Sequence, residues 1–115
     1  MTHNFQNLAI WKRGCELAEA TYKAFSGSRE NDFKSQMVRS SLSIPSNIAE
    51  GSERRSEPDF IRFLSYAKSS AAELYTQATI ANNLSIISPD TAQHLQKESL
   101  ELASMIEALI QRLAK

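Results

Sequence analysis

Four polar residues near the middle of the chain have types and spacing that suit a local packing or binding site. Arg39, Ser43, Asn47 and Glu50 follow one another at intervals of four, four and three residues, so on a helix they share one face. This spacing predicts an Arg39–Ser43 contact and an Asn47–Glu50 contact along the helix. We interpret the set as a structural polar network that specifies helix packing. The alternative is a binding pocket for a polar ligand.

The sequence offers little for catalysis or metal binding. Hydrolytic chemistry needs a nucleophile, a base and an orienting group close together. We expect His3 in a frayed terminus and His94 on a solvated surface. The Glu-x-x-His pairs of di-iron bundles do not occur in the sequence, and the single cysteine, Cys15, excludes an intramolecular disulfide and a cysteine-based zinc site. We therefore predict a non-enzymatic protein without metal or cofactor, in which Cys15 is a small buried apolar residue.

Five basic residues are candidates for contacting nucleic acid. The chain has 13 basic and 13 acidic side chains, so it lacks the basic excess that usually accompanies such binding. The alternative is that these cations belong to an ordinary solvated surface. The candidates are Arg54 and Arg55 in a polar loop, Arg62 shortly after it, and Lys12 and Arg13 near the N-terminus.

Length and composition indicate one soluble domain. A chain of 115 residues, with 42% hydrophobic and 23% charged residues, is typical of a single globular domain covering residues 1–115. Three glycines and three prolines are too few for the many turns of a sandwich or barrel. No segment resembles a signal peptide or reaches the roughly 18 apolar residues of a membrane-spanning helix. These features predict a cytoplasmic protein with no membrane partner.

Apolar residues at spacings of three and four predict two helices in the first half of the chain. The first covers about residues 8–25, and Gly27 behind it suits a left-handed cap. The second begins near Asp32, is bent at Pro45 and ends before Gly51, which we expect to be its cap. The predicted inner stripes are Leu8, Trp11, Cys15, Ala18, Tyr22 and Phe25 in the first helix, and Phe33, Met37, Ser41, Ile44 and Ile48 in the second.

Two further helices begin at clear start signals. Ser56 and Ser88 are each followed by a proline and an acidic residue, the arrangement of a capped first turn. The third helix extends to about Leu84. The predicted stripes are Phe60, Leu64, Ala67, Ala71, Leu74, Ala78 and Ala81, and then Leu95, Ser99, Leu102, Ile106, Leu109 and Leu113.

Short connections between these helices predict an all-α fold, an antiparallel up-down-up-down four-helix bundle. The helices also carry apolar residues beyond one stripe each, which favours self-association. The alternative is a wide core that buries these residues within one copy. The additional residues are Ile10, Leu17 and Ala24, then Phe63, Tyr66 and Tyr75, then Leu100, Ala103 and Ile110.

Several motifs in the chain together resemble a known family. Residues 39–51 read RSSLSIPSNIAEG, and Arg54, FIRFL at residues 60–64 and ELYTQ at residues 73–77 follow them. The chain begins its first helix with LAIWK at residues 8–12. With these motifs it resembles, over essentially its whole length, the bacterial four-helix-bundle family first met as reading frames inside intervening sequences of 23S ribosomal RNA genes.

The resemblance implies a bundle that assembles into a ring-like homopentamer. Relatives include the accessory protein of diversity-generating retroelements, which binds a reverse transcriptase and nucleic acid. The resemblance thus implies a nucleic-acid or ribonucleoprotein accessory module, with RNA or DNA and a reverse transcriptase or another protein as partners. One alternative is a protein-binding scaffold with no nucleic-acid role. Another is a small-molecule or catalytic bundle, which would require a pocket around Asn47 and Glu50.

Overall fold

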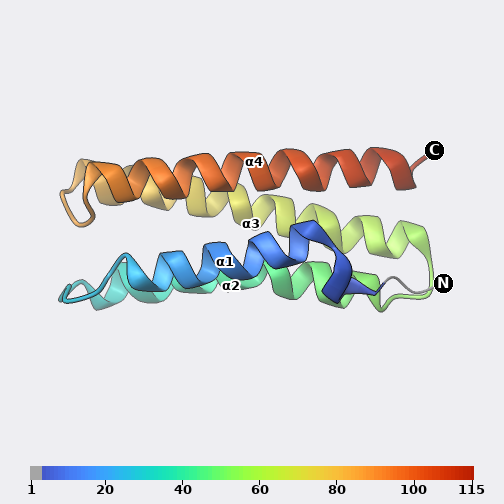
Figure 1. The fold of residues 1–115 in the computed structure, drawn as a ribbon, viewed down its shortest axis with the longest axis horizontal. Helices are drawn as coiled ribbons and strands as arrows, with labels where there is room; N and C mark the ends of the chain where they lie inside the picture. The colour runs from blue at the N-terminus through green and yellow to red at the C-terminus, as the bar shows by residue number, and fades with distance from the viewer. Residues whose placement is uncertain (1–3) are drawn as a thin grey trace.

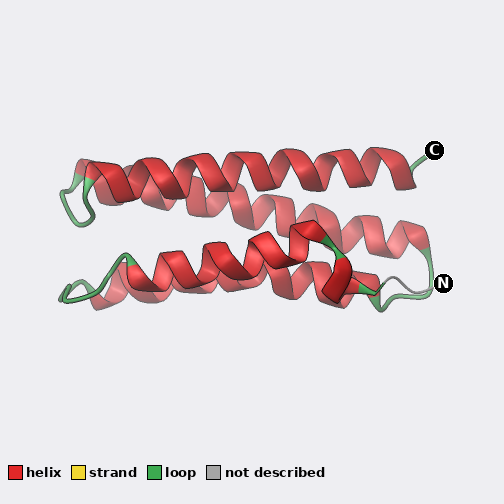
Figure 2. Cartoon of the chain, viewed as in Figure 1, coloured by secondary structure: helices red, strands yellow, loops and turns green. Residues whose placement is uncertain are grey.

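The chain folds into four long helices that run alternately up and down. The structure, a computed structural model, describes residues 4–115, and no strand occurs in that range. Each α-helix is antiparallel to the one before it, which confirms the predicted bundle (Figures 1 and 2). The bundle measures 45 × 19 × 19 Å. The elements are the 3-10 helix η1 (Phe5–Asn7) and the α-helices α1 (Ala9–Lys23), α2 (Asn31–Ser52), α3 (Glu57–Asn83) and α4 (Pro89–Leu113).

Each helix packs against the helices next to it in the chain, and the first helix also contacts the last. The helix α1 lies against α2, α2 against α3, and α3 against α4, and α1 packs more lightly on α4. In Figure 1 the N-terminal end of α1 therefore lies beside the C-terminal half of α4. No helix within the described residues combines the length and hydrophobicity needed to cross a bilayer.

The start signals of α3 and α4 act as the sequence predicts. The Ser56 hydroxyl accepts a hydrogen bond from the Asp59 backbone N–H at 3.2 Å, and Ser88 accepts one from Thr91 at 3.1 Å. Each bond satisfies an N–H group that lacks a partner within the helix. Gly27, after α1, has a φ of 76° and so takes the predicted left-handed conformation.

We expect Ser56→Ala to lower the free energy of unfolding by about 1 kcal/mol, because the cap is removed and its amide partner is left to water. Urea denaturation followed by circular dichroism measures this. Ser46→Ala is the matched control, because Ser46 is exposed within α2 and caps nothing. An equal change in both variants would show that the cap contributes nothing.

The predicted stripes of α2, α3 and α4 form most of the core. Every predicted stripe residue of α3 is buried, as are those of α2 and α4 except Phe33 and Leu113, which are partly buried. Four of the seven stripe residues of α3 are alanines, so neighbouring helices can approach it closely. The largest side chains that are essentially inaccessible include Phe25, Met37, Ile44, Ile48, Phe60, Leu64, Leu74, Leu95, Leu102 and Ile106.

The inward face of α1 differs from the prediction. Ile10 and Leu17, which the sequence assigned to an additional row, are buried, whereas Tyr22 of the predicted stripe is 58% exposed. The reason is the crossing with α2, where Gly14 meets Pro45. A Cβ atom on Gly14 would lie 3.2 Å from the Pro45 Cβ, so this side of α1 is the one that can pack closely. The inward face of α1 thus combines Ile10 and Leu17 of the additional row with Ala18 of the predicted stripe, and Phe25 just after the helix is buried as well.

The prediction that Gly51 caps the second helix is also wrong. Gly51 lies inside α2, which ends at Ser52, and its φ is not positive. Its role is steric, since a Cβ atom there would lie 2.7 Å from the Phe63 Cβ and 2.9 Å from the Phe60 Cδ1. The absent side chain lets the start of α3 fold back onto the end of α2.

Candidate functional site

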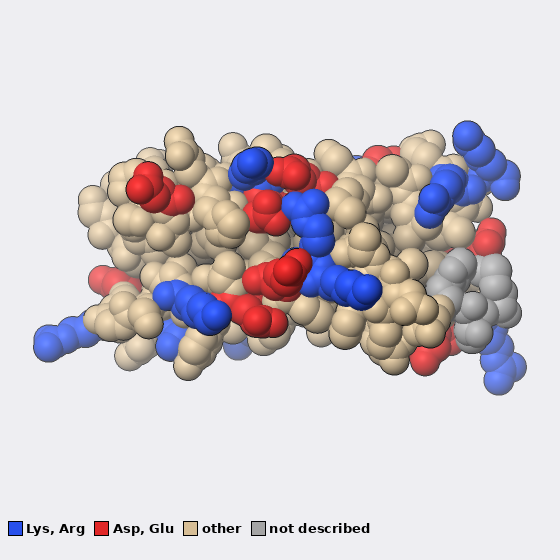
Figure 3. All heavy atoms as spheres, in the orientation of Figure 1, with Lys and Arg blue, Asp and Glu red and all other residues tan. Residues whose placement is uncertain are grey.

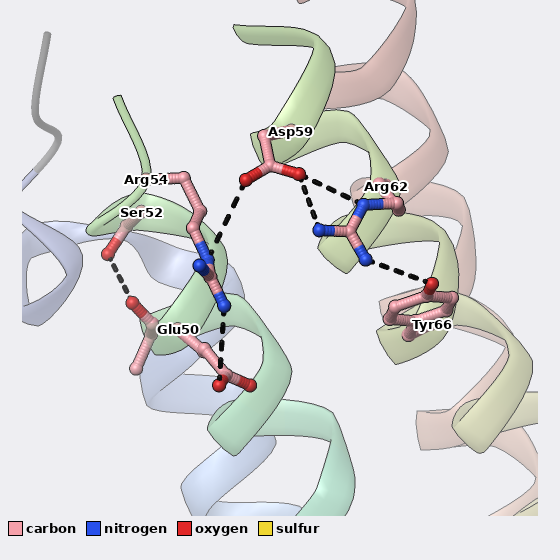
Figure 4. A network of polar contacts seen from close by, with 7 residues as sticks. Glu50, Ser52, Arg54, Asp59, Arg62 and Tyr66 are labelled. Carbon is pink, nitrogen blue, oxygen red and sulfur yellow. Dashed lines mark hydrogen bonds and ion pairs between the residues drawn. The ribbon is translucent and has the colours of Figure 1, made fainter. Parts of the chain in front are cut away.

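The turn between α2 and α3 carries a chain of polar contacts on the protein surface. Arg54 lies 3.7 Å from Glu50 and 3.8 Å from Asp59, so it connects the two helices. Arg62 donates to Asp59 at 2.9 and 2.5 Å and to the Tyr66 hydroxyl at 3.2 Å. Figure 4 shows these side chains in sequence, with Asp59 between the two arginines. Asp59 is thus the central acceptor of the cluster.

Both arginines also lie close to the aromatic ring of Phe63. The guanidinium carbons of Arg54 and Arg62 lie 4.5 and 4.7 Å from the centre of the Phe63 ring, at distances typical of cation–π contacts. Tyr66 meets the same ring edge to face, with ring centres 5.5 Å apart. Hydrogen bonds with Tyr66 and then Asp59 raise the pKa of Arg62. Two of the predicted nucleic-acid contacts are therefore engaged within the subunit.

The net charge around this turn is not basic. Residues 50–62 contain three arginines and the four acidic residues Glu50, Glu53, Glu57 and Asp59, which gives a net charge of −1. Arg55 is exposed and has no hydrogen bond or ion pair within residues 4–115. Of the three predicted cations here, only Arg55 has no partner among residues 4–115.

Of the two candidate cations near the N-terminus, Arg13 has acidic partners and Lys12 has none among the described residues. Arg13 reaches across to α4, where it donates to Glu98 at 2.7 Å and lies 3.5 Å from Glu101. The hydrogen bond to Glu98 raises the pKa of Arg13, although burial opposes the shift. Lys12 is exposed and has no such partner among the described residues. On the face that Figure 3 shows, basic and acidic side chains are mixed at the middle and form no continuous basic surface.

Of the four residues of the predicted polar network, only Ser43 and Asn47 contact each other. The Asn47 amide donates to the Ser43 carbonyl at 2.8 Å and lies 3.0 Å from the Ser43 hydroxyl, which in turn accepts from Ser70 of α3 at 3.0 Å. The expected Asn47–Glu50 pair is absent from the described contacts, because Glu50 points toward Arg54 instead (Figure 4). Asn47 and Ser43 are thus joined along α2, and Ser43 connects this pair to α3 through Ser70.

The other predicted contact, between Arg39 and Ser43, is also absent from the described contacts. Arg39 instead lies at the mouth of a polar groove between α2 and α3, which has a volume of about 400 Å³. We call it the α2–α3 groove. The sequence alone predicts no role for two of its residues, Glu73 and Gln77, although both belong to the ELYTQ motif. Their spacing of four on the polar edge of α3 was the available signal. The lining residues are Gln36, Arg39, Ser40, Ser43, Glu73 and Gln77.

An apolar groove lies on the opposite side of α2. The α1–α2 groove, of about 470 Å³, is lined mainly by apolar side chains, and Leu42 and Tyr22 in it are 52% and 58% exposed. Three more large apolar side chains, Ile80, Leu84 and Leu100, are exposed on α3, at its end and on α4, and we call them the α3–α4 apolar residues. The α1–α2 groove is lined by Cys15, Ala18, Glu19, Tyr22, Lys23, Val38, Leu42 and Pro45.

The nine apolar residues that the sequence places outside the inner stripes are exposed only in part. Phe63 joins the core together with Ile10 and Leu17, whereas Tyr66 and Leu100 are exposed. The other four, Ala24, Tyr75, Ala103 and Ile110, are partly buried. One copy thus hides some of the surplus apolar surface and leaves the rest accessible.

The remaining candidates for chemistry have no catalytic arrangement among the described residues. Cys15 is partly buried, and burial together with Glu19 and Glu16 raises the pKa of its thiol, so the reactive thiolate is disfavoured. His94 is exposed on α4, as predicted. His3 lies outside the described residues. No group of three or more histidine, cysteine or acidic side chains in residues 4–115 is arranged to hold a metal ion.

Comparison with known proteins agrees with the motifs and with the fold. A solved structure, that of a protein with unknown function from the S23 ribosomal protein family of Bacteroides thetaiotaomicron, is similar with a TM-score of 0.80. At 23% identity over 89% of this chain and 98% of the other, the likeness shows a shared fold. No curated protein matches the chain. The sequence model described as 23S rRNA-intervening sequence protein matches residues 6–108, so the chain belongs to this family.

Proposed function

We propose that this protein is a non-enzymatic subunit of a cytoplasmic homo-oligomer, a pentameric ring, that acts as an accessory module for nucleic acid or a ribonucleoprotein. The observation that carries the proposal is the set of large apolar side chains left exposed on a bundle whose core is already filled. Two of these side chains, Tyr22 and Leu42, share the α1–α2 groove, and a continuous exposed apolar surface marks an interaction site. The matched family has no described activity, and its name records an association with 23S rRNA genes.

The position of the exposed residues supports a ring. The α1–α2 groove and the α3–α4 apolar residues come from different helices, so contact between them joins unlike surfaces of two copies. Such heterologous contacts close into rings when the rotation between copies allows it. Basic side chains that are weak alone, such as Arg55 and Lys12, are then repeated around the ring, and multivalency strengthens binding.

We expect the oligomer to shift a structured RNA in a gel at low salt and to release it as salt rises, because phosphate contacts release counterions. Arg55→Gln and Lys12→Gln should weaken binding and reduce the slope of log K against log salt by about 0.9 for each phosphate that the variant no longer neutralises. Arg54→Gln is the matched control, because Arg54 is already engaged by Glu50, Asp59 and Phe63. Absence of any shift at low salt would remove the nucleic-acid role.

A protein-binding scaffold is the second candidate. The net charge of −1 at residues 50–62 and the apolar α1–α2 groove both suit a protein partner better than a phosphate backbone. An oligomer that binds no RNA at low salt, while its assembly stays intact, would favour this candidate.

A further inference from the structure

Two apolar side chains lie at the same level on the surface where α3 meets α4. The Gln96 side-chain amide of α4 donates to the Thr79 hydroxyl of α3 at 2.9 Å, which fixes the register of these antiparallel helices. Tyr75 precedes Thr79 by four residues, so it lies one turn from this bond on the same face of α3. Leu100 follows Gln96 by four residues and lies at the matching level of α4. Leu100 is 55% exposed and Tyr75 is partly buried, and we call this pair the α3–α4 ridge.

The polar groups that flank the ridge have partners within the same copy. On one side, the Thr79 hydroxyl donates to the Tyr75 carbonyl at 2.9 Å and accepts from Gln96. On the other side, two turns along both helices, Lys68 of α3 donates to Glu107 of α4 at 2.9 Å. The two charges of this ion pair compensate each other. Covering the ridge therefore leaves no charge without a partner, which keeps the desolvation cost low.

The exposed apolar residues of α3 lie on a different face, the one that α3 turns toward α2. Ser40 of α2 donates to Glu73 at 2.9 Å, so the side of α3 with Glu73 faces α2. Ile80 follows Glu73 by seven residues and Leu84 follows it by eleven, so both lie on this α2–α3 face. Glu73 has no ion pair within residues 4–115, where its hydrogen bond comes from a neutral hydroxyl. A second copy packed on the α2–α3 face would have to desolvate this charge, so the ridge is the less costly surface to cover.

The α1–α2 groove is a recess that suits a large apolar side chain. Its floor consists of Cys15, Ala18 and Pro45, which are small and at least partly buried. Its walls are Tyr22 and Leu42, which are more than half exposed. The groove is thus concave and apolar, whereas the ridge carries one exposed leucine.

The charges of the two surfaces also match. The charged residues that line the groove are one acid, Glu19, and one base, Lys23, so the groove has no net charge. The ridge has none either, because the ion pair beside it is neutral. Two neutral apolar surfaces therefore meet without repulsion, and neither selects a charged partner. Since one chain carries both surfaces, a second copy is the occupant that they favour.

We propose that the α3–α4 ridge of one copy occupies the α1–α2 groove of the next, with Leu100 lying over Cys15 and Ala18. This inference rests on the proposed homo-oligomer and identifies the surface that fills its groove. The two surfaces belong to different pairs of helices, so each copy offers both at once, as the heterologous contacts of a ring require. Ile80 and Leu84 lie outside the contact.

Disulfide trapping in the full-length protein tests this contact. Cys15 is the single cysteine of the chain and lies on the α2 side of α1, whereas Leu100 lies on the α3 side of α4, so the two are apart within one copy. In Leu100→Cys, oxidised glutathione should join Cys15 to the introduced thiol of the neighbouring copy, because a disulfide needs Cα atoms about 4.4–6.8 Å apart. Burial raises the pKa of the Cys15 thiol, so the reaction is run at about pH 9. We expect a ladder of covalent oligomers on a non-reducing gel, and a reductant should remove it.

Matched cysteine variants show whether the trap is specific. Ile80→Cys and Leu84→Cys place the same thiol at exposed apolar positions of the α2–α3 face. Both should assemble like the parent protein and form no ladder.

Charge variants on α3 give a second measurement that needs no cysteine. Lys68→Glu leaves two carboxylates beside the ridge, so it should raise the dissociation constant between subunits at least about tenfold in sedimentation velocity. Glu73→Lys is the matched control, because it reverses one charge on the α2–α3 face of the same helix and should leave assembly unchanged. Lys68 and Glu73 are both exposed, so the fold should be retained.

Several results would overturn the ridge contact. They are an assembled Leu100→Cys without a ladder, a ladder from Ile80→Cys or Leu84→Cys, and a Lys68→Glu variant that assembles as tightly as the parent protein. A covalent dimer of the parent protein through Cys15 would show instead that two grooves meet each other. A monomeric parent protein in sedimentation removes the proposed oligomer itself, whereas an assembled parent without the expected ladder in its variant removes only the ridge contact.

Discussion

A Leu42→Glu variant is expected to be monomeric under conditions where the parent protein is an oligomer. Leu42 is half exposed on the α1–α2 groove, so it contributes little to the fold of one copy. In an assembly, burying the exposed half of Leu42 contributes about 0.8–1.5 kcal/mol per contact, roughly half the value for a fully exposed leucine, and an unpaired carboxylate in its place adds a desolvation cost. Because every subunit of a ring supplies this surface once, the destabilisation is repeated at every interface.

Light scattering and sedimentation velocity measure the outcome, and Ser46→Glu is the matched control. Ser46 is exposed on α2 and does not line the α1–α2 groove, so the same added charge should leave assembly intact. The thermal unfolding of monomeric Leu42→Glu should show an intact helical bundle. If Leu42→Glu assembles like the parent protein, the α1–α2 groove is not an interface.

A mixing experiment then tests whether the contact joins unlike surfaces. Leu100→Glu, which alters the α3–α4 apolar residues, should also be monomeric. Mixing the two variants leaves one copy with an intact α1–α2 groove and the other with intact α3–α4 apolar residues. A heterologous contact therefore predicts one-to-one dimers in the mixture and none in either variant alone. Monomers throughout the mixture would refute the ring geometry.

The second large effect is expected from Gly51→Ala. The new Cβ would lie 2.7 Å from the Phe63 Cβ, an atom next to the backbone that can move only if α3 itself shifts. Overpacking of this kind costs about 1–3 kcal/mol, which exceeds the gain of about 1 kcal/mol that alanine brings to a helix interior. We expect a lower melting temperature, by roughly 4–8 °C for each kcal/mol of stability removed.

Gly14→Ala is the matched control for this variant. Gly14 lies in the interior of α1, so alanine there brings the full gain in helix propensity, whereas Gly51 is next to the last residue of α2 and gains less. Its nearest neighbour would be the Pro45 Cβ at 3.2 Å, a less severe contact than at Gly51. Thermal unfolding should therefore rank Gly51→Ala below Gly14→Ala. The reverse order would show that the end of α2 can separate from α3 at little cost.

The predicted site residues illustrate how far local patterns reach. The polar set on α2 was predictable as a group because residues four apart share a helix face. The contacts of this set were not predictable, because Ser43 accepts a hydrogen bond from Ser70 and Glu50 pairs with Arg54. The same limit applies to the candidate cations, since Arg13 is engaged by Glu98 of α4 and Arg54 by Asp59 of α3. A partner that lies on another helix leaves no signal in the spacing.

The sequence alone determined the number of helices, their starts at Ser56 and Ser88, and the inner stripes of α2, α3 and α4. These features depend on periodicity and on hydrogen bonds within a few residues, which a chain carries wherever it packs. Only the tertiary structure decided which residues of the two α1 rows face the core, and that Gly51 allows close packing against α3. Both depend on how closely a neighbouring helix approaches, at Pro45 in one case and at Phe63 in the other. The distance between two helices depends on both of them, so the sequence of one helix alone does not predict it.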